Sequence, residues 1–488
     1  MRVILIITFQ RDGSGVEELM QKVDMIIKSG TICTSHGFFN AGLAIEAGKI
    51  VSIGSDANLP EAEEIIDASG KIVIPGLIDV HAHLREPGYT HKEDFETGTR
   101  AAAAGGVTFV ADMPNVKPPL NTLERFKKHN ETAKKKAIID FSHNPSGTVL
   151  KEIPKLAKEH PLSFKIFQMS DIGRDYPHMP GIGLDDDGLL LQVFQEIAKT
   201  ELPVQVHPWN QPVWDAITKE CWEKGELDCR AYAKAVRKYE SIIFDSAIST
   251  LLFLQRASGV KLHVMHVSST RGIEMLTEAK ARGQTVTYEI NPHDVFLGNK
   301  WENIERLGPY SIGWWVPEAD AEATWEALAD GRADIIGTDH APHTREEKEV
   351  GWKEMWKAPG GTPALEWYLK LFLTEVNRGR LSLERLVQLS SENPAKIFHV
   401  YPRKGVIQVG SDADLVLIDM KKKEILKEDN MYTKCGWNPY AGSKVEGIPM
   451  LTIVRGKVIM ENGEVIGKPG FGKYIPSLVK HEEVPHSN

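Results

Sequence analysis

The amino-acid sequence predicts an α/β protein: a (β/α)8 TIM-type barrel with a small discontinuous β-sandwich formed by both chain ends. Three observations predict this fold. The 488-residue chain is too long to fold around one ordinary hydrophobic core, but its length fits a barrel domain of about 250 to 400 residues plus a smaller domain. Apolar strand candidates alternate with helical patterns in the middle of the chain, and short β-branched runs occur at both ends.

The two chain ends share a sequence pattern that is typical of small antiparallel strands. Runs such as LAIEAGKIVSIGS near the start and MLTIVRGKVIMENGEVIG near the end are β-branched and separated by Gly, Ser or Asp. Two such flanks can pair into one sheet domain. The expected division is an N-terminal extension (1–24), a β-sandwich (25–74 plus 400–470), a barrel (75–399) and a C-terminal tail (471–488).

Between these ends, apolar strands alternate with helices, which predicts a parallel sheet covered on both faces. Eight strands are the number that a closed α/β barrel needs. The predicted strands are 72–80, 107–113, 137–143, 163–169, 203–207, 261–268, 285–291 and 333–339. Predicted helices include 93–104, 187–200, 230–257 and 270–282.

Composition and charge argue against several classes of partner. A net charge of −9 and a pI near 6.0 disfavour nucleic acid and anionic membranes, which attract basic surfaces. No apolar run approaches the roughly 20 residues that span a bilayer, and no cleavage site follows the short apolar N-terminal run. The four cysteines form no CxxC pair, which is typical of reduced thiols. We therefore expect a cytoplasmic protein without nucleic-acid or membrane partners.

Unusual polar residues fall at the carboxyl ends of the predicted barrel strands, where barrel enzymes place catalytic groups. They are His81 and His83 after the first strand, Lys165 in the fourth, His207 in the fifth, His266 in the sixth and Asp339 in the eighth. This repetition predicts a metal site at one barrel face.

The histidines allow both a metal-binding and a structural interpretation. His81 and His83 form an HxH, in which two side chains on an extended segment point the same way and can reach one metal. HxH also occurs by chance, and His207 and His266 could each be hydrogen-bonded core residues. His263 and His266 differ by three, so on a strand they would face opposite sides and only one could point into the barrel mouth.

Lys165 interrupts the apolar strand FKIF. Burial of an ammonium is costly and lowers its pKa. Such a lysine could reach water or pair with a carboxylate. Alternatively, its neutral amine could capture CO2 as a carbamate that bridges two cations. The convergence of four histidines and an aspartate on the same face favours the carbamate.

Several motifs together resemble the cyclic amidohydrolases, most closely dihydroorotase, with allantoinase and the hydantoinases as relatives. They are DVHAHLREPG (79–88), KEDFETGTRAAAAGGVTFVADMPN (92–115), HVSS (266–269), GTDHAPHTREEK (337–348), ENPAKIF (392–398), KGVIQVGSDADLVLID (404–419) and KCGWNPYAG (434–442). The resemblance covers nearly all of the chain after residue 25. It implies an enzyme that hydrolyses a cyclic amide, such as dihydroorotate.

The resemblance also implies a ligand set for two divalent metal ions, expected to be zinc. One metal would take His81, His83 and Asp339, the other would take His207 and His266, and carboxylated Lys165 would bridge them. A hydroxide between the metals would be the nucleophile, because metal binding brings the pKa of water from about 15.7 toward neutrality. Asp339 would serve as the general base.

Three further residues would bind the substrate by the same resemblance. Arg85, Asn115 and His343 correspond to residues that hold a substrate carboxylate, and an arginine meets a carboxylate with two parallel hydrogen bonds. Arg85 could instead form a structural salt bridge, Asn115 could cap a loop, and His343 could support another ligand. The expected partner is a small anionic cyclic amide, and the expected assembly is a homodimer or homotetramer.

Three departures from the family pattern leave the substrate open. This chain has HPWNQ (207–211), GPYSIGWWVPEAD (308–320) and EINPH (289–293) where relatives read differently. Trp209, Trp314 and Trp315 could form an aromatic mouth, or could be packing or subunit contacts. An allantoinase or a hydantoinase/dihydropyrimidinase-like enzyme therefore stays an alternative.

Other classes fit less well. A zinc deaminase of this barrel type works with one metal and has no use for Lys165. A phosphotriesterase-like enzyme would share the lysine and both metals, but not the pair Arg85 and Asn115. A non-catalytic scaffold relative typically loses metal ligands, whereas this chain has all six.

Overall fold

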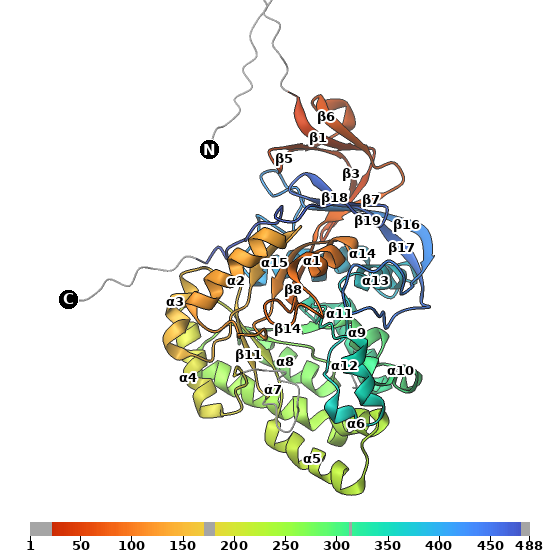
Figure 1. The fold of residues 1–488 in the computed structure, drawn as a ribbon. Helices are drawn as coiled ribbons and strands as arrows, with labels where there is room; N and C mark the ends of the chain where they lie inside the picture. The colour runs from red at the N-terminus through yellow and green to blue at the C-terminus, as the bar shows by residue number, and fades with distance from the viewer. Residues whose placement is uncertain (1–21, 170–180, 312–314, 480–488) are drawn as a thin grey trace, which may run out of the picture.

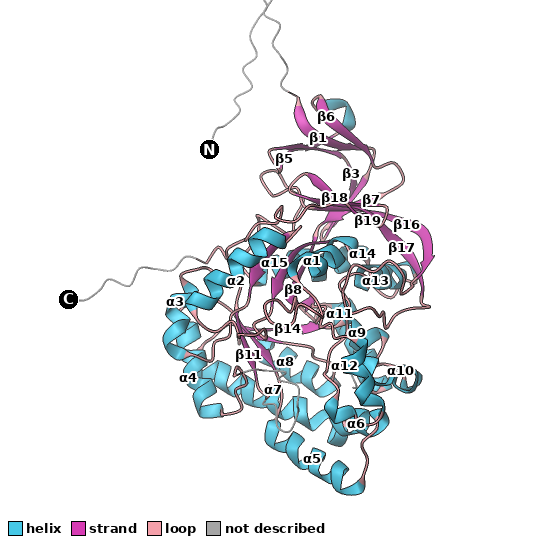
Figure 2. Cartoon of the chain, viewed as in Figure 1, coloured by secondary structure: helices cyan, strands magenta, loops and turns pink. Residues whose placement is uncertain are grey.

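The computed structural model describes residues 22–169, 181–311 and 315–479. The strands of the two terminal segments gather at one end of the molecule, and helices surround the remaining strands (Figure 1 and Figure 2). Most of the expected N-terminal extension lies outside the described residues. No helix in the described ranges is long and apolar enough to cross a membrane.

The central strands form two parallel sheets, ordered β10-β9-β8 and β11-β12-β13-β14-β15. Their bounds are β8 Leu77–Ala82, β9 Val107–Asp112, β10 Asp140–His143, β11 Phe164–Phe167, β12 Val204–His207, β13 Leu262–Val264, β14 Val286–Ile290 and β15 Ile335–Ile336. Isolated parallel bridges join the sheets at both edges, between Ser146 and Lys165 and between Ala82 and His340.

The first predicted strand, 72–80, is in fact two strands. β7 (Ile72–Pro75) pairs with β16 (Leu415–Ile425) in a terminal sheet, whereas β8 belongs to the central strands. Gly76 separates them and donates its N–H to the Asp414 carbonyl at 2.8 Å. A Cβ at Gly76 would lie 2.2 Å from Thr108 Oγ1, so the chain crosses between the sheets where only glycine fits.

The helices connect and cover the central strands. They are α1 Phe95–Ala104, α2 Leu123–Lys136, α3 Ile153–Ala157, α4 Asp187–Ala198, α5 Gln211–Lys224, α6 Cys229–Val236, α7 Lys238–Ser258, α8 Thr270–Ala281, α9 Pro292–Phe296, α10 Trp301–Leu307, α11 Glu318–Asp330, α12 Arg345–Glu349, α13 Tyr368–Asn377, α14 Leu383–Val387 and α15 Asn393–Ile397. The helix predicted for 230–257 is interrupted twice: α6 ends at Val236, and Tyr239, Glu240 and Ser241 near the start of α7 have left-handed backbone angles.

The terminal segments form two further sheets, ordered β5-β4-β1-β6 and β19-β18-β17-β16-β7-β2-β3. Their remaining strands are β1 Val23–Lys28, β2 Thr31–Thr34, β3 Gly37–Asn40, β4 Gly42–Glu46, β5 Lys49–Gly54, β6 Ala62–Asp67, β17 Lys444–Val454, β18 Lys457–Glu461 and β19 Glu464–Val465. The pairing is not purely antiparallel as predicted, because β1 with β6 and β2 with β7 run parallel. Both sheets contribute to one apolar cluster that contains Met25, Ile45, Leu415 and Ile453.

Buried ion pairs and the last described residues attach the terminal sheets to the central strands. Lys404, which is fully buried, bonds Asp140 of β10 at 2.5 Å and Asp414 at 2.6 Å. Tyr474 forms a parallel bridge with Phe141. The described part of the expected C-terminal tail therefore packs along β10.

Candidate active site

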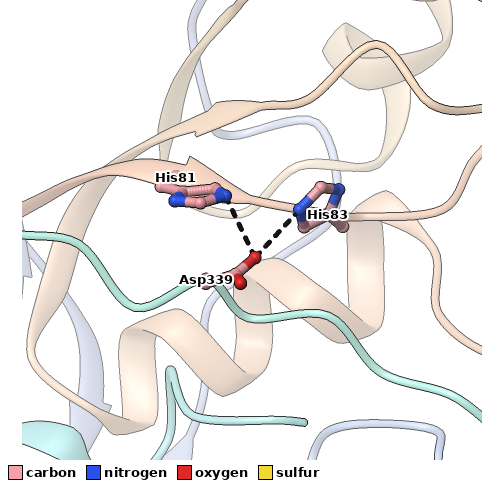
Figure 3. A group of neighbouring side chains, drawn as sticks. All are labelled: His81, His83 and Asp339. Atoms are coloured by element: carbon pink, nitrogen blue, oxygen red, sulfur yellow. Dashed lines mark hydrogen bonds and ion pairs between the residues drawn. The ribbon is translucent and has the colours of Figure 1, made fainter. Parts of the chain in front are cut away.

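Two histidines and an aspartate converge where β8 and β15 end. β8 is buried along its whole length and carries His81, and His83 directly follows its last residue, Ala82. His81 Nε2 lies 3.0 Å and His83 Nε2 lies 3.1 Å from Oδ1 of Asp339. Figure 3 shows the two rings directed at this one carboxylate. Their donor atoms all lie within 4.8 Å of one another, which suits a single metal ion.

The backbone around this site is strained. Arg85, His266 and Asp339 have φ values of 63°, 39° and 45°, in the left-handed region that side chains other than glycine rarely adopt. Such conformations persist only where surrounding contacts hold them in place, and they cluster at functional sites. The strain therefore supports a functional site at the carboxyl ends of β8, β13 and β15.

Glu289 of β14 is a site residue that the sequence did not predict. Its Oε1 lies 2.5 Å from His81 Nδ1, and the whole side chain is buried. A carboxylate behind a ligand histidine fixes the ring orientation and makes its other nitrogen a better ligand. Burial opposes charge on His81, yet the carboxylates of Glu289 and Asp339 raise its pKa to about 9.

The parity argument for His263 and His266 does not apply, because β13 ends at Val264, before His266. Both residues contact Glu289. The backbone N–H of His266 lies 3.4 Å from Oε1, and His263 Nε2 lies 3.5 Å from Oε2. His263 thus supports Glu289 from within the strand, and His266 lies on the loop that follows.

His207 and His266 form a second pair of candidate ligands. His207 Nδ1 lies 2.7 Å from His266 Nε2, and the two ring centroids are 4.3 Å apart. The His266 ring is 6.1 Å from the His81 ring, so this pair adjoins the first group. Two neighbouring ligand groups are what a two-metal site requires.

Lys165 is fully buried on β11 and contacts the sulfur of Met265. Its Nζ lies 4.5 Å from the Phe167 ring centroid. Burial lowers the pKa of Lys165 to about 7, against the opposing effect of Glu289 and Asp339. Much of this amine is therefore neutral near pH 7, and the neutral amine is the form that reacts with CO2.

The three predicted substrate residues fall into two groups. Arg85 is buried; its Nε donates to the Pro342 carbonyl at 3.2 Å, and its Nη2 lies 3.0 Å from His343 Nε2. Asn115 instead lies on His83, with Oδ1 2.6 Å from Nδ1, and its Nδ2 has no hydrogen-bond partner among the described residues. Asn115 thus orients a candidate metal ligand while its amide N–H groups stay available.

Two buried lysines that the sequence did not single out, Lys92 and Lys348, lie near Arg85. Lys92 Nζ lies 3.2 Å from His343 Nδ1 and 2.8 Å from Glu347. Lys348 is fully buried and donates to the Pro359 carbonyl at 2.7 Å. Burial and the Arg85 charge lower the pKa of Lys92 to about 8 and that of Lys348 to about 7. Cationic groups therefore outnumber Glu347 in this region.

The tryptophans of the segments that differ from the family pattern lie in separate places. Trp209 is buried and packs against Trp214 and Phe244, with ring centroids 5.2 and 5.5 Å away. Trp315 packs against Trp301, with centroids 5.2 Å apart. Trp314 lies outside the described residues. The Trp209 ring is 5.9 Å from His207, so the aromatic cluster supports one candidate ligand.

Known proteins resemble this chain over most of its length. Residues 72–459 match the model of the amidohydrolase family. L-hydantoinase of Paenarthrobacter aurescens is 36% identical over 93% of this chain and 98% of that protein. A dihydroorotase of Methanosphaera stadtmanae is 35% identical over 83% and 89%. The solved structure of L-hydantoinase (dihydropyrimidinase) from Arthrobacter aurescens has a TM-score of 0.88 and 35% identity, and covers 93% of this chain and 100% of that one.

Proposed function

The chain belongs to the amidohydrolase family, whose TIM-barrel-type α/β fold it shares, and from this premise we propose that it is a metal-dependent hydrolase of cyclic amides. The convergence of His81, His83 and Asp339 at one strand edge carries the proposal. Hydantoinases and dihydroorotases resemble the chain equally well. A panel assay of dihydroorotate, hydantoins, dihydrouracil and allantoin tests the proposal, and no hydrolysis of any ring by metal-loaded protein would contradict it.

The donor set suits two divalent ions, which we propose to be zinc. Imidazole and carboxylate groups are the usual zinc ligands, and here they are buried and close together. We assign His81, His83 and Asp339 to one ion, His207 and His266 to the other, and a carbamate on Lys165 to both. When bound, such ions lower the pKa of water and polarise a carbonyl group.

The protein groups then complete the hydrolysis. Water oxygen bonds to the amide carbon, the C–N bond of the ring breaks, and the ring nitrogen gains a proton. Asp339 accepts the proton from water and returns it to the nitrogen, because its carboxylate lies among the candidate ligands. In the metal-free protein burial raises the pKa of Asp339, but the charge of His81 and the hydrogen bonds from His81 and His83 outweigh it and keep this pKa well below its ordinary value, so the carboxylate is ionised.

The substrate is a small cyclic amide, and we favour one that bears a carboxylate. Arg85 and His343 contact each other, and Nζ of Lys92 lies 3.2 Å from Nδ1 of His343. Such a region stabilises an anion. Dihydroorotate is the first candidate. The similarity to L-hydantoinase supports the second candidate, a neutral hydantoin or dihydropyrimidine ring.

We also infer how the four sheets assemble. The bridges at Ser146–Lys165 and Ala82–His340 support one closed eight-stranded barrel. The apolar cluster shared by the terminal sheets supports a β-sandwich made from both chain ends. We propose that the active unit is a homodimer or homotetramer, which sedimentation at micromolar concentration would test.

A further inference from the structure

A second group of candidate metal ligands lies behind the proposed active site. Asp112 ends β9, His143 ends the neighbouring strand β10, and His129 lies on α2. Their donor atoms lie within 4.8 Å of one another, and all three residues are at least 97% buried. His129 Nε2 is 3.0 Å from Asp112 Oδ2, and the two histidine rings are 4.6 Å apart.

The hydrogen bonds of this group are incomplete. Neither ring nitrogen of His143 has a hydrogen-bond partner among the described residues, and Nδ1 of His129 also has none. A buried polar atom without a partner costs about 1–3 kcal/mol, and buried polar atoms in native proteins are nearly always satisfied. A ligand that accepts a nitrogen lone pair would remove part of this cost, because each neutral ring has one nitrogen with a lone pair.

The surroundings of His143 are aromatic. Phe95, Phe126, Phe141 and Tyr474 have ring centroids 5.4–6.1 Å from the His143 ring. These rings keep bulk water away from the group. An apolar shell of this kind strengthens the interaction of an ion with its ligands.

We propose that Asp112, His129 and His143 bind one divalent transition-metal ion of the zinc class. Two imidazoles and one carboxylate are a donor set that such ions prefer. The buried aspartates Asp140 and Asp414 give a useful contrast, because the Lys404 ammonium already lies between them. No lysine or arginine contacts the Asp112 carboxylate among the interactions of the described residues.

The proposed ion would stabilise the loop that carries the active-site residues. Asp112 Oδ1 accepts the backbone N–H of Leu84 at 2.7 Å, and Leu84 lies between His83 and Arg85. An ion on the other carboxylate oxygen would fix Asp112 and therefore this loop. The role is structural, so it does not depend on which cyclic amide the enzyme hydrolyses.

The test is the zinc content of the full-length chain, measured by elemental analysis after purification with Zn²⁺. His143→Phe should lower the content by one ion per chain, and Phe suits the aromatic surroundings. The same loss should occur when His143→Phe is added to the double variant His81→Ala, His83→Ala. That background separates this site from the proposed active site. His36→Phe, at a side chain that is 84% exposed, is the matched control and should lose no zinc.

His129→Leu provides a second variant if His143→Phe does not fold, and it should also lose one ion. In the His81→Ala, His83→Ala background, Zn²⁺ should raise the Tm, and His143→Phe or His129→Leu should abolish this increase. Equal zinc contents in the parent and in either folded variant would overturn the proposal. The bond between His129 and Asp112 would then be an ordinary hydrogen bond.

Discussion

Nδ1 of His81 lies 2.5 Å from Oε1 of Glu289, and this contact directs the opposite nitrogen of the ring at Asp339. The ring cannot turn without breaking a buried, charge-assisted hydrogen bond. The geometry of the proposed metal site thus depends on a residue that binds no metal itself.

Glu289→Gln keeps the size of the side chain and removes its charge. We expect zinc affinity to fall by about 10- to 100-fold, the usual effect of losing a carboxylate behind a ligand histidine. Competition with a chromogenic chelator measures this. Glu366→Gln is the control, because Glu366 is also buried but accepts the backbone N–H of Tyr432. Unchanged affinity in Glu289→Gln would show that His81 needs no partner.

The pH dependence of metal binding follows from the pKa of His81, about 9 in the metal-free protein. Below that pH the ring carries a proton that metal must displace. Affinity should therefore rise with pH, by up to about tenfold per unit, and level off near pH 9. Titration calorimetry in buffers of different ionisation enthalpy should detect proton release at pH 7. If no proton is released, His81 is not protonated in the metal-free protein at pH 7 and the prediction is wrong.

Lys165→Ala should lose nearly all activity, because the proposed carbamate oxygens would be missing. Short carboxylic acids should restore part of the activity by supplying those oxygens. Lys370→Ala is the control, because the Lys370 side chain is also largely buried but bonds Glu424 of β16 at 2.6 Å and, among the described residues, none of the candidate ligands. If Lys165→Ala turned over substrate at the wild-type rate, Lys165 would have a structural role and no role in metal binding.

Asp339→Asn keeps the shape of the side chain but removes the proposed base. The kcat should fall by roughly 10²- to 10⁴-fold, the usual contribution of a positioned general base. Zinc content must be measured in parallel, since Asp339 is also a proposed ligand. Asp334→Asn, just before β15 and bonded to Lys280 and the Tyr288 N–H, should keep the wild-type kcat. Retained activity in Asp339→Asn would assign the proton transfer to another group.

The sequence could predict that His81, His83 and Asp339 lie together, because the carboxyl ends of neighbouring parallel strands meet at one edge. HxH spacing and the strand-end positions of His81, His83 and Asp339 were sufficient to expect their contact. Gly76 was the missed signal for the break between β7 and β8, since a continuous apolar run concealed it. One glycine in such a run does not by itself distinguish a crossing from a strand.

The supporting residues could not be predicted in this way. Glu289 is one carboxylate in an apolar strand, and its partner His81 lies on a strand far away in the sequence. Asn115 was expected at the substrate, yet it also bonds His83, a contact fixed by side-chain packing. Strand periodicity assigns a residue to a face, whereas these contacts depend on the orientation of individual side chains.

Arg85→Met distinguishes the two candidate substrates. If Arg85 holds a substrate carboxylate, the variant should lose about 2–3 kcal/mol of transition-state stabilisation for dihydroorotate, roughly 30- to 150-fold in kcat/KM. Neutral rings such as dihydrouracil should be spared, because they offer no negative charge to the guanidinium. Arg100→Met is the control, since Arg100 pairs with Glu96 on α1 and should affect neither substrate. If the variant impairs all rings equally, or the wild type prefers neutral rings, Arg85 supports the loop through Pro342 and His343, and the enzyme is a hydantoinase.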